Sequence, residues 1–228
     1  MKTEAGLPTK VFISWSGGKD STMALREILR ARDKYDVAGL LTTITEGDER
    51  VQIQNVRRAL IERQAASLNL PVHFVHIPKG ATNQEYEDKT ARALSALRDG
   101  GVEAVAFGDL FLGDIRRYRE RLLTGLGMRG LFPLWERETR AVVAAFIDAG
   151  FGAMITSVRQ DALDRSFAGR IIDRGFVDAL PPGVDPCGEN GEFHTFVFDG
   201  PLFARRVLCA TGAVTEADGH FYCDLLPV

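Results

Sequence analysis

Short apolar runs and longer amphipathic stretches alternate along the first half of the chain. The apolar runs occupy residues 11–15, 37–45, 72–77 and 102–110, and the helix-like stretches between them occupy 21–35, 55–70 and 82–101. Strands that alternate with helices of this length pair in parallel through right-handed crossovers. The pattern therefore predicts an α/β fold with a doubly wound parallel sheet, and ligands of such sheets bind beyond the carboxyl ends of the strands.

The pattern changes near residue 131, where a proline interrupts the apolar run "LFPLW" and the later segments become shorter and richer in turn residues. These segments are a helix-like 138–150, an apolar 152–158, a loop at 180–191, a strand-like 192–198, and an antiparallel pair at 202–214 and 219–226. We therefore predict two closely packed regions, a first domain over residues 1–130 and a smaller C-terminal α+β region over 131–228.

Composition and charge narrow the class of protein. The chain is 45% hydrophobic and 26% charged, which is typical of soluble globular proteins, and its net charge of −3 gives no general attraction to nucleic acid. Its three cysteines contain no CxxC pair, which favours a reducing, cytoplasmic setting over a disulfide framework or a zinc site. No apolar run approaches the roughly 20 residues of a membrane span. We expect neither a membrane nor a nucleic-acid partner, and a homodimer stays open.

The densest group of candidate functional residues is "SGGKDS" at 16–21, where the first apolar run meets the first helix. Gly17 and Gly18 permit backbone conformations closed to other residues, and the free amides at a helix N-terminus attract anions. Lys19 adds a positive charge suited to phosphate, and Asp20 suggests that Mg²⁺ accompanies a polyphosphate. The plain alternative is a well-capped turn. The patterns GxGxxG and GxxxxGK[ST] do not fit the turn.

The six residues resemble SGGxDS, the PP-loop motif of the ATP pyrophosphatase superfamily, whose members cleave ATP between the alpha and beta phosphates. The resemblance implies that a substrate oxygen attacks the alpha phosphate and that pyrophosphate leaves into the glycine-rich turn. A nitrogen or sulfur nucleophile then attacks the adenylated substrate. The resemblance also implies that adenine lies against the end of the second strand, from Thr42 to Thr45. We expect Lys19 to be an exposed residue whose removal leaves the fold nearly intact.

A second block, "FGDLFLGDIRRYRERLLTGLGMRGLFPLW" at 107–135, resembles the segment that follows the fourth strand in the diphthine ammonia ligase family. The matching positions are Gly108, Asp109, Asp114, Arg117, Arg119, Glu120, Pro133, Leu134 and Trp135. Acids and arginines that begin a helix at the carboxyl end of a strand would face the ATP. The alternative is that this charge run forms only a solvated helix face.

A third block, "DPCGENGEFHTFVFDGP" at 185–201, resembles the Gly-Glu-Gly-Gly-Glu-Phe/Tyr-Glu-Thr motif of the same family. Asn190 stands where the family pattern has a glycine, and His194 stands where it has a glutamate. In an extended strand Glu192 and His194 point to the same side, so this face would carry an acid and an imidazole in place of two acids. We expect this change to alter the choice of acceptor. We interpret Cys187 as a structural residue.

Together the blocks imply a ligase that uses ATP and Mg²⁺ to adenylate a carboxylate, releases pyrophosphate, and joins ammonia or another amine to the carboxylate. The expected ATP-binding residues are Ser14, Ser16, Gly17, Gly18, Lys19, Asp20, Ser21, Thr42 and Gly108. The expected substrate-binding residues are Asp114, Arg117, Arg119, Glu189, Asn190, Glu192 and His194. The expected catalytic residues are Lys19, Asp20, Asp109, Glu189 and Glu192, and the expected metal ligands are Asp20 and Asp109.

Two alternatives to the ligase stay open. One is a nucleotide sensor that holds ATP or AMP without turnover. The other is an RNA-modifying enzyme of the same superfamily, against which the negative net charge and the isolated cysteines weigh.

Overall fold

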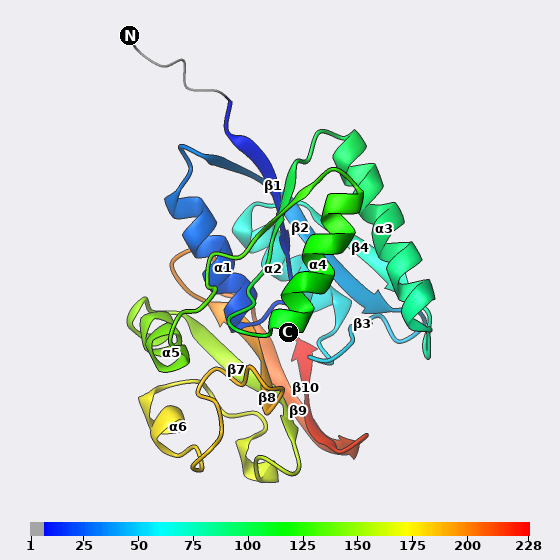
Figure 1. The fold of residues 1–228 in the computed structure, drawn as a ribbon. Helices are drawn as coiled ribbons and strands as arrows, with labels where there is room; N and C mark the ends of the chain where they lie inside the picture. The colour runs from blue at the N-terminus through cyan, green and yellow to red at the C-terminus, as the bar shows by residue number, and fades with distance from the viewer. Residues whose placement is uncertain (1–6) are drawn as a thin grey trace.

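The computed structural model describes residues 7–228 and arranges them around two sheets (Figure 1). The parallel strands of the first sheet are β1 (Thr9–Ser14), β2 (Tyr35–Thr45), β4 (Val72–Ile77), β5 (Ala104–Ala106) and β6 (Arg129–Leu131). They lie in the order β4-β2-β1-β5-β6, and the short β3 (Arg50–Val51) pairs antiparallel with the end of β2. The carboxyl ends of β1 and β5 therefore lie side by side.

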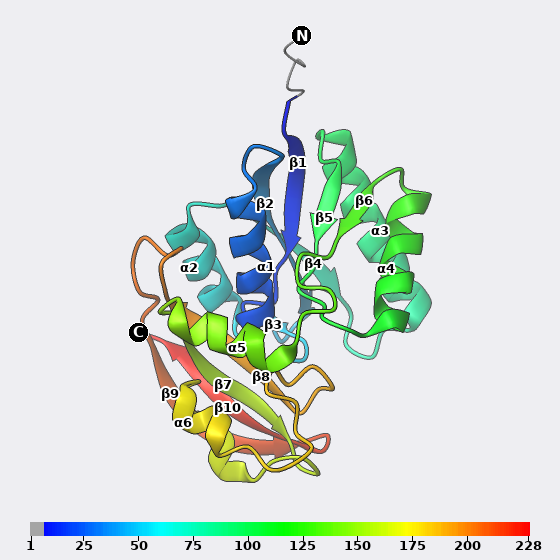
Figure 2. The ribbon, with the colours of Figure 1, turned by 60° about the vertical axis from the view of Figure 1, so that its left-hand side comes forward.

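Helices cover both faces of this sheet (Figure 2). They are α1 (Lys19–Arg30) and α2 (Arg58–Leu68) on one face, and α3 (Asn83–Asp99) and α4 (Gly113–Gly125) on the other. The alternation along β1 is visible in the core, because Ile13 packs in the cluster that holds α1 and α2, whereas Phe12 packs in the cluster that holds α3 and α4. The predicted doubly wound sheet is confirmed.

The second sheet is antiparallel, with strands in the order β8-β7-β10-β9. Its elements are β7 (Gly152–Arg159), β8 (Phe193–Asp199), β9 (Cys209–Ala217) and β10 (His220–Pro227), accompanied by α5 (Thr139–Asp148), α6 (Arg174–Asp178) and a 3₁₀ turn at Arg165–Phe167. The expected strand at 202–214 is wrong in its first half. The backbone there bonds elsewhere, with Ala204 N donating to Ser67 O and Val207 N donating to Phe198 O.

One hydrophobic cluster continues from the first sheet into the second. It contains Val11 and Ile13 of β1 together with Ile155 of β7 and Phe196 of β8, all of them buried. A shared core of this kind fixes the two sheets relative to each other, so residues of β8 can take part in a site at the end of β1. Across residues 7–228, the structure contains no helix whose length and apolar character would let it cross a membrane.

Candidate functional site

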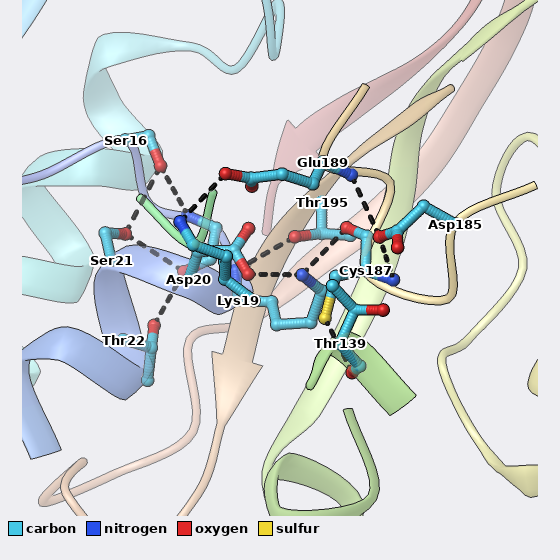
Figure 3. Close-up of polar contacts among 12 residues, drawn as sticks. Ser16, Lys19, Asp20, Ser21, Thr22, Thr139, Asp185, Cys187, Glu189 and Thr195 are labelled. Atoms are coloured by element: carbon cyan, nitrogen blue, oxygen red, sulfur yellow. Dashed lines mark hydrogen bonds and ion pairs between the residues drawn. The ribbon is translucent and has the colours of Figure 1, made fainter. Parts of the chain in front are cut away.

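The glycine turn, residues Ser16 to Thr22, leaves the end of β1 and begins α1. Gly17 adopts the left-handed φ of 80°, and Gly18 is the N-cap of the helix. The Gly18 carbonyl accepts hydrogen bonds from Ser21 Oγ at 3.0 Å and from Thr22 Oγ1 at 2.9 Å, while Ser16 Oγ accepts from the Gly18 amide at 3.3 Å. The hydroxyls of Ser16 and Ser21 lie 3.2 Å apart (Figure 3). The turn thus gathers hydroxyls and an amide at one helix N-terminus.

A cavity of about 290 Å³ opens beside this turn, and both regions of the chain line it. From the first sheet and its loops come Ser14, Ser16, Gly18, Asp20, Ser21, Ile53, Gln54, Gly108, Asp109, Leu112, Ile115 and Arg119. From the segment around the start of β8 come Cys187, Gly188, Glu189, Phe193, His194 and Thr195. Most of the expected site residues therefore meet in one cavity at the carboxyl ends of the strands.

Strand β8 holds the glycine turn directly. The Val197 amide donates to the Gly17 carbonyl at 2.9 Å, and the Lys19 amide donates to Thr195 Oγ1 at 2.9 Å. A Cβ atom on Gly18 would lie 2.9 Å from the Thr195 carbonyl oxygen, so the approach permits only glycine without a shift of backbone. The shape of the turn depends on contacts from the second sheet.

The prediction that Lys19 is exposed is wrong, because its side chain is completely buried. It is the first residue of α1, and its Nζ donates to Asp20 Oδ1 at 2.5 Å and to the Cys187 carbonyl at 2.9 Å. Burial by itself would lower the pKa of Lys19, but the charge of Asp20, the hydrogen bond to Asp20 and the nearby Cys187 and Glu189 together outweigh burial and raise it. Lys19 therefore stays charged and ties the turn to the segment before β8.

Three carboxylates share the cavity, those of Asp20, Asp109 and Glu189. Glu189 Oε1 accepts from the Leu110 amide at 2.9 Å, yet burial, helped by the charge of Asp20, raises the pKa of Glu189 to about 7. Burial also raises the pKa of Asp109, although Arg119 Nη1 lies 2.9 Å from its Oδ2 and opposes the shift. The cavity thus holds an acid that exchanges its proton near neutrality.

Gly108 allows the loop after β5 to approach the glycine turn. A Cβ atom at this position would lie 2.6 Å from the carbonyl carbon of Asp20 and 2.9 Å from the Ser21 amide nitrogen. Distances this short do not occur for a real Cβ, so only glycine lets Asp109 reach the cavity from this loop.

The expectation for Glu192 and His194 needs correction. His194 lines the cavity, whereas Glu192 is buried and accepts from the Asp185 amide at 3.1 Å, the Asn190 amide at 3.0 Å and Asn190 Nδ2 at 3.0 Å. The reason is that β8 begins only at Phe193, so Glu192 belongs to the turn before the strand and satisfies its amides. Burial lowers the pKa of His194 to about 4, which keeps its imidazole neutral at pH 7.

Besides Lys19 and Glu192, four further expected site residues have side chains outside the cavity lining. Thr42 is buried, and its hydroxyl donates to the Trp15 carbonyl at 2.8 Å. Asn190 is exposed beside Glu192, and Asp114 and Arg117 pair with each other on the surface of α4, with side chains 92% and 65% exposed. The structure therefore brings only Arg119 of the helix charge run into the cavity.

Several residues that hold or line the site carry no sequence signal of their own. Gln64 of α2 contacts the glycine turn, and Ile53 and Gln54 reach the cavity from the loop after β3. An isolated glutamine in a helix or an isoleucine in a loop is common, so only the fold identifies them. Cys187 agrees with a structural interpretation, because burial raises the pKa of its thiol to about 12 and its Sγ donates to the Thr139 carbonyl at 3.1 Å.

The cavity offers two carboxylates to a magnesium ion, those of Asp20 and Asp109. Within residues 7–228, no group of three or more His, Cys, Asp or Glu side chains is arranged to hold a metal ion. Mg²⁺ in nucleotide sites commonly uses one or two carboxylates and completes its shell with water and phosphate oxygens. The residues therefore fit a magnesium ion that arrives with a polyphosphate better than a resident metal.

Two family models match the chain, the diphthamide synthase N-terminal domain over residues 9–130 and the diphthamide synthase C-terminal domain over residues 138–223. A protein of Schizosaccharomyces pombe named diphthine–ammonia ligase is 26% identical over 231 residues, which covers 92% of this chain and 38% of that protein. A protein of the same name from Danio rerio is 26% identical over 227 residues, covering 90% and 89%. One from Homo sapiens is 31% identical over 119 residues, covering 50% and 44%. The chain thus spans less than half of the first relative's length.

Proposed function

Because the chain belongs to the diphthamide synthase family, we propose that it is an ATP-dependent ligase that converts a carboxylate into an amide, with AMP and pyrophosphate as the other products. The observation that carries the proposal is the glycine turn, because Ser16, Gly18 and Ser21 line the same cavity as Glu189 and the hydroxyls of Ser16 and Ser21 lie together there. Donors fixed before the reaction stabilise charge that develops on a leaving group. The turn supplies such donors to pyrophosphate.

The reaction has two steps. In the first, an oxygen of the acceptor carboxylate attacks the alpha phosphorus of ATP, and the bond to the oxygen that bridges the alpha and beta phosphates breaks. Pyrophosphate leaves toward Ser16, Gly18 and Ser21. In the second, ammonia attacks the acyl carbon, AMP leaves, and Glu189 accepts the surplus proton of the attacking nitrogen. A pKa of about 7 suits a group that must accept a proton near neutral pH.

Asp20 and Asp109 would hold a magnesium ion that accompanies ATP, and such an ion would supply positive charge for the phosphates in a cavity that already contains carboxylates. Lys19 stays charged close behind the turn and adds to the positive field there without lining the cavity. Arg119 orients Asp109 through their ion pair. These roles need no covalent nucleophile.

The name of the relatives makes diphthine the first acceptor to test, with ammonia as the nitrogen donor. His194 is the residue of this cavity that departs from the family pattern. A neutral imidazole at this position adds no negative charge to a cavity that holds three carboxylates. We expect His194→Glu to shift the preference among acceptors, and equal kinetics on every acceptor would remove His194 from acceptor selection.

Pyrophosphate release tests the function. Purified protein, ATP, Mg²⁺ and an ammonium salt are incubated with diphthine-containing protein or with simple carboxylic acids, and pyrophosphate, AMP and the amide product are measured. The proposal expects the three products in equal amounts and only when an acceptor is present. ATP binding with no product from any acceptor would instead support the sensor.

A further inference from the structure

Gln64, near the middle of α2, has a completely buried side chain that lies against the glycine turn. Its Oε1 accepts from Trp15 Nε1 at 2.9 Å, and its Nε2 donates to the carbonyls of Gly17 at 2.9 Å and Val197 at 2.6 Å. A buried amide is stable only when its donors and acceptors are satisfied. The side chain therefore has one fixed orientation, in which it joins the end of β1, the turn and β8.

The Gly17 carbonyl is held by two donors at once, Gln64 Nε2 and the Val197 amide, each at 2.9 Å. A carbonyl oxygen has two lone pairs, so these bonds use its full capacity. Neither donor residue lines the cavity. The oxygen is thus directed into the protein, toward α2 and β8.

The orientation of this carbonyl decides where the next amide points. The peptide between Gly17 and Gly18 is planar and trans, so its N–H points opposite to its C=O. The Gly18 amide accordingly reaches Ser16 Oγ at 3.3 Å, and both residues line the cavity. Two adjacent glycines make a peptide flip inexpensive. A flip would turn an oxygen, which repels phosphate, toward the position of the donor.

We propose that Gln64 is a positioning residue for ATP cleavage, which prevents this flip and keeps the Gly18 N–H on the side of Ser16 Oγ, where both residues line the cavity. The proposal rests on the proposed function, in which the turn holds the departing pyrophosphate. Gln64 acts through the Gly17–Gly18 peptide without touching the ligand. The residue that orients the turn therefore comes from another helix, 47 positions after Gly17.

Two substitutions separate this role from general packing. Gln64→Glu keeps the volume and the acceptor for Trp15 but removes both Nε2 donors. Gln64→Leu removes every polar contact. For both, we expect kcat for pyrophosphate release to fall by roughly 10²-fold, the size of effect found when one oxyanion donor is lost. We expect the KM for ATP to change less, because Gln64 does not line the cavity and acts only on the orientation of one peptide.

The pH profile of Gln64→Glu provides a signature that altered packing would not. When the introduced carboxyl is protonated, it regains one O–H donor for the Gly17 carbonyl. The activity of Gln64→Glu relative to wild type should therefore rise as the pH falls. The relative activity of Gln64→Leu should not depend on pH.

Ser67→Ala is the matched control, because Ser67 lies in the same helix and also joins α2 to the C-terminal region. Its buried hydroxyl donates to the Arg205 carbonyl and accepts from the Arg205 amide at 3.1 Å, away from the turn. Thermal unfolding of every variant sets an assay temperature at which each is folded. Ser67→Ala should retain the wild-type kcat.

A second readout, the Kd of inorganic pyrophosphate with Mg²⁺ measured by calorimetry, does not depend on turnover. Weaker pyrophosphate binding by both Gln64 variants, with binding by Ser67→Ala unchanged, supports the proposal even if no acceptor has been found. Wild-type kcat and Kd in a folded Gln64→Leu, or an equal loss in Ser67→Ala, would overturn it. A wild-type protein that neither releases nor binds pyrophosphate would overturn the proposed function as well.

Discussion

The glycine turn and the segment from Asp185 to Glu192 line the same cavity, but they are held in different ways. The turn has hydrogen bonds of its own, but its position depends on side chains of other elements, those of Gln64 of α2 and Thr195 of β8. The second segment is held largely by its own acids, because Asp185 accepts from the amides of Cys187 at 2.8 Å and Glu189 at 3.2 Å, and Glu192 accepts from two more amides of the segment. Lys19, Leu110 and Arg159 add bonds from other elements.

This difference predicts how each part responds to change. The turn should be sensitive to substitutions in distant elements, whereas the segment should be sensitive mainly to its own acids. One residue joins the two parts, since Lys19 begins the helix of the turn and its Nζ donates to the carbonyl of Cys187. The substitutions below test this division.

Removing Lys19 should have the largest effect, because it disturbs both parts. Lys19→Ala leaves Asp20 without its ion-pair partner and the Cys187 carbonyl without a donor, and it opens a cavity at a buried position. We expect a loss of unfolding free energy on the order of 3 kcal/mol, together with severe loss of ATP cleavage. Urea unfolding measures the first quantity. The control is Lys79→Ala, at a lysine side chain that is 80% exposed, which should change stability little. If Lys19→Ala is as stable as the control, Lys19 does not join the turn to the segment from Asp185 to Glu192.

Gly108→Ala tests the turn from outside. The added Cβ would meet the backbone of Asp20 and Ser21 at less than 3.0 Å. Separating these segments should lower the unfolding free energy by about 1–3 kcal/mol and should weaken ATP cleavage. Gly125→Ala, at the end of α4 with no atom within 4 Å of the added Cβ, serves as the control and should stabilise the protein slightly. A Gly108→Ala variant with unchanged melting temperature and kcat would show that the close contact between the loop after β5 and the turn is not required.

Glu192→Gln tests the segment from within. The substitution replaces one acceptor oxygen by an NH₂ group that faces existing donors, so we expect a loss of about 1–2 kcal/mol in unfolding free energy. Glu189→Gln should instead cost little stability and should reduce the rate of the ammonia step. Comparing urea unfolding with amide formation for the two variants separates the structural glutamate from the reactive one. If Glu189→Gln instead lowers the unfolding free energy and Glu192→Gln instead slows amide formation, the two glutamates have the opposite roles.

Glu189 should also make stability depend on pH. Its pKa rises from 4.5 in the unfolded chain to about 7 in the fold, so between these values the folded state binds more protons. The wild-type contribution from Glu189 is thus most favourable below about pH 4.5 and is lost as the pH rises to about 7. The difference in unfolding free energy between wild type and Glu189→Gln should fall through this range and then level off. A difference that grows with pH would mean that the fold stabilises the charged carboxylate.

Much of the fold can be predicted from the local pattern of apolar and polar residues. A site residue can be predicted only where its residue type fits a single role. The alternation of apolar runs and helices was sufficient for the doubly wound sheet, and the glycines of the turn were predictable because few other residues fit there. The division between Glu189 and Glu192 was not predictable, because loop amides and a ligand compete for the same carboxylates. The burial of Lys19 depends on contacts with a segment that lies 168 positions away.

The smallest effect should come from Arg117→Gln, compared with Arg119→Gln on the same helix. Arg119 lines the cavity and pairs with Asp109, whereas Arg117 pairs with Asp114 on the surface, where such pairs contribute about 0–1 kcal/mol. We expect Arg119→Gln to lower kcat/KM for ATP clearly and Arg117→Gln to leave it close to wild type. The KM for a protein-bound acceptor is the sensitive measurement for Arg117. If that value rises while the KM for ATP is unchanged, the acceptor extends from the cavity across the surface of α4, and Arg117 binds it as the sequence predicts.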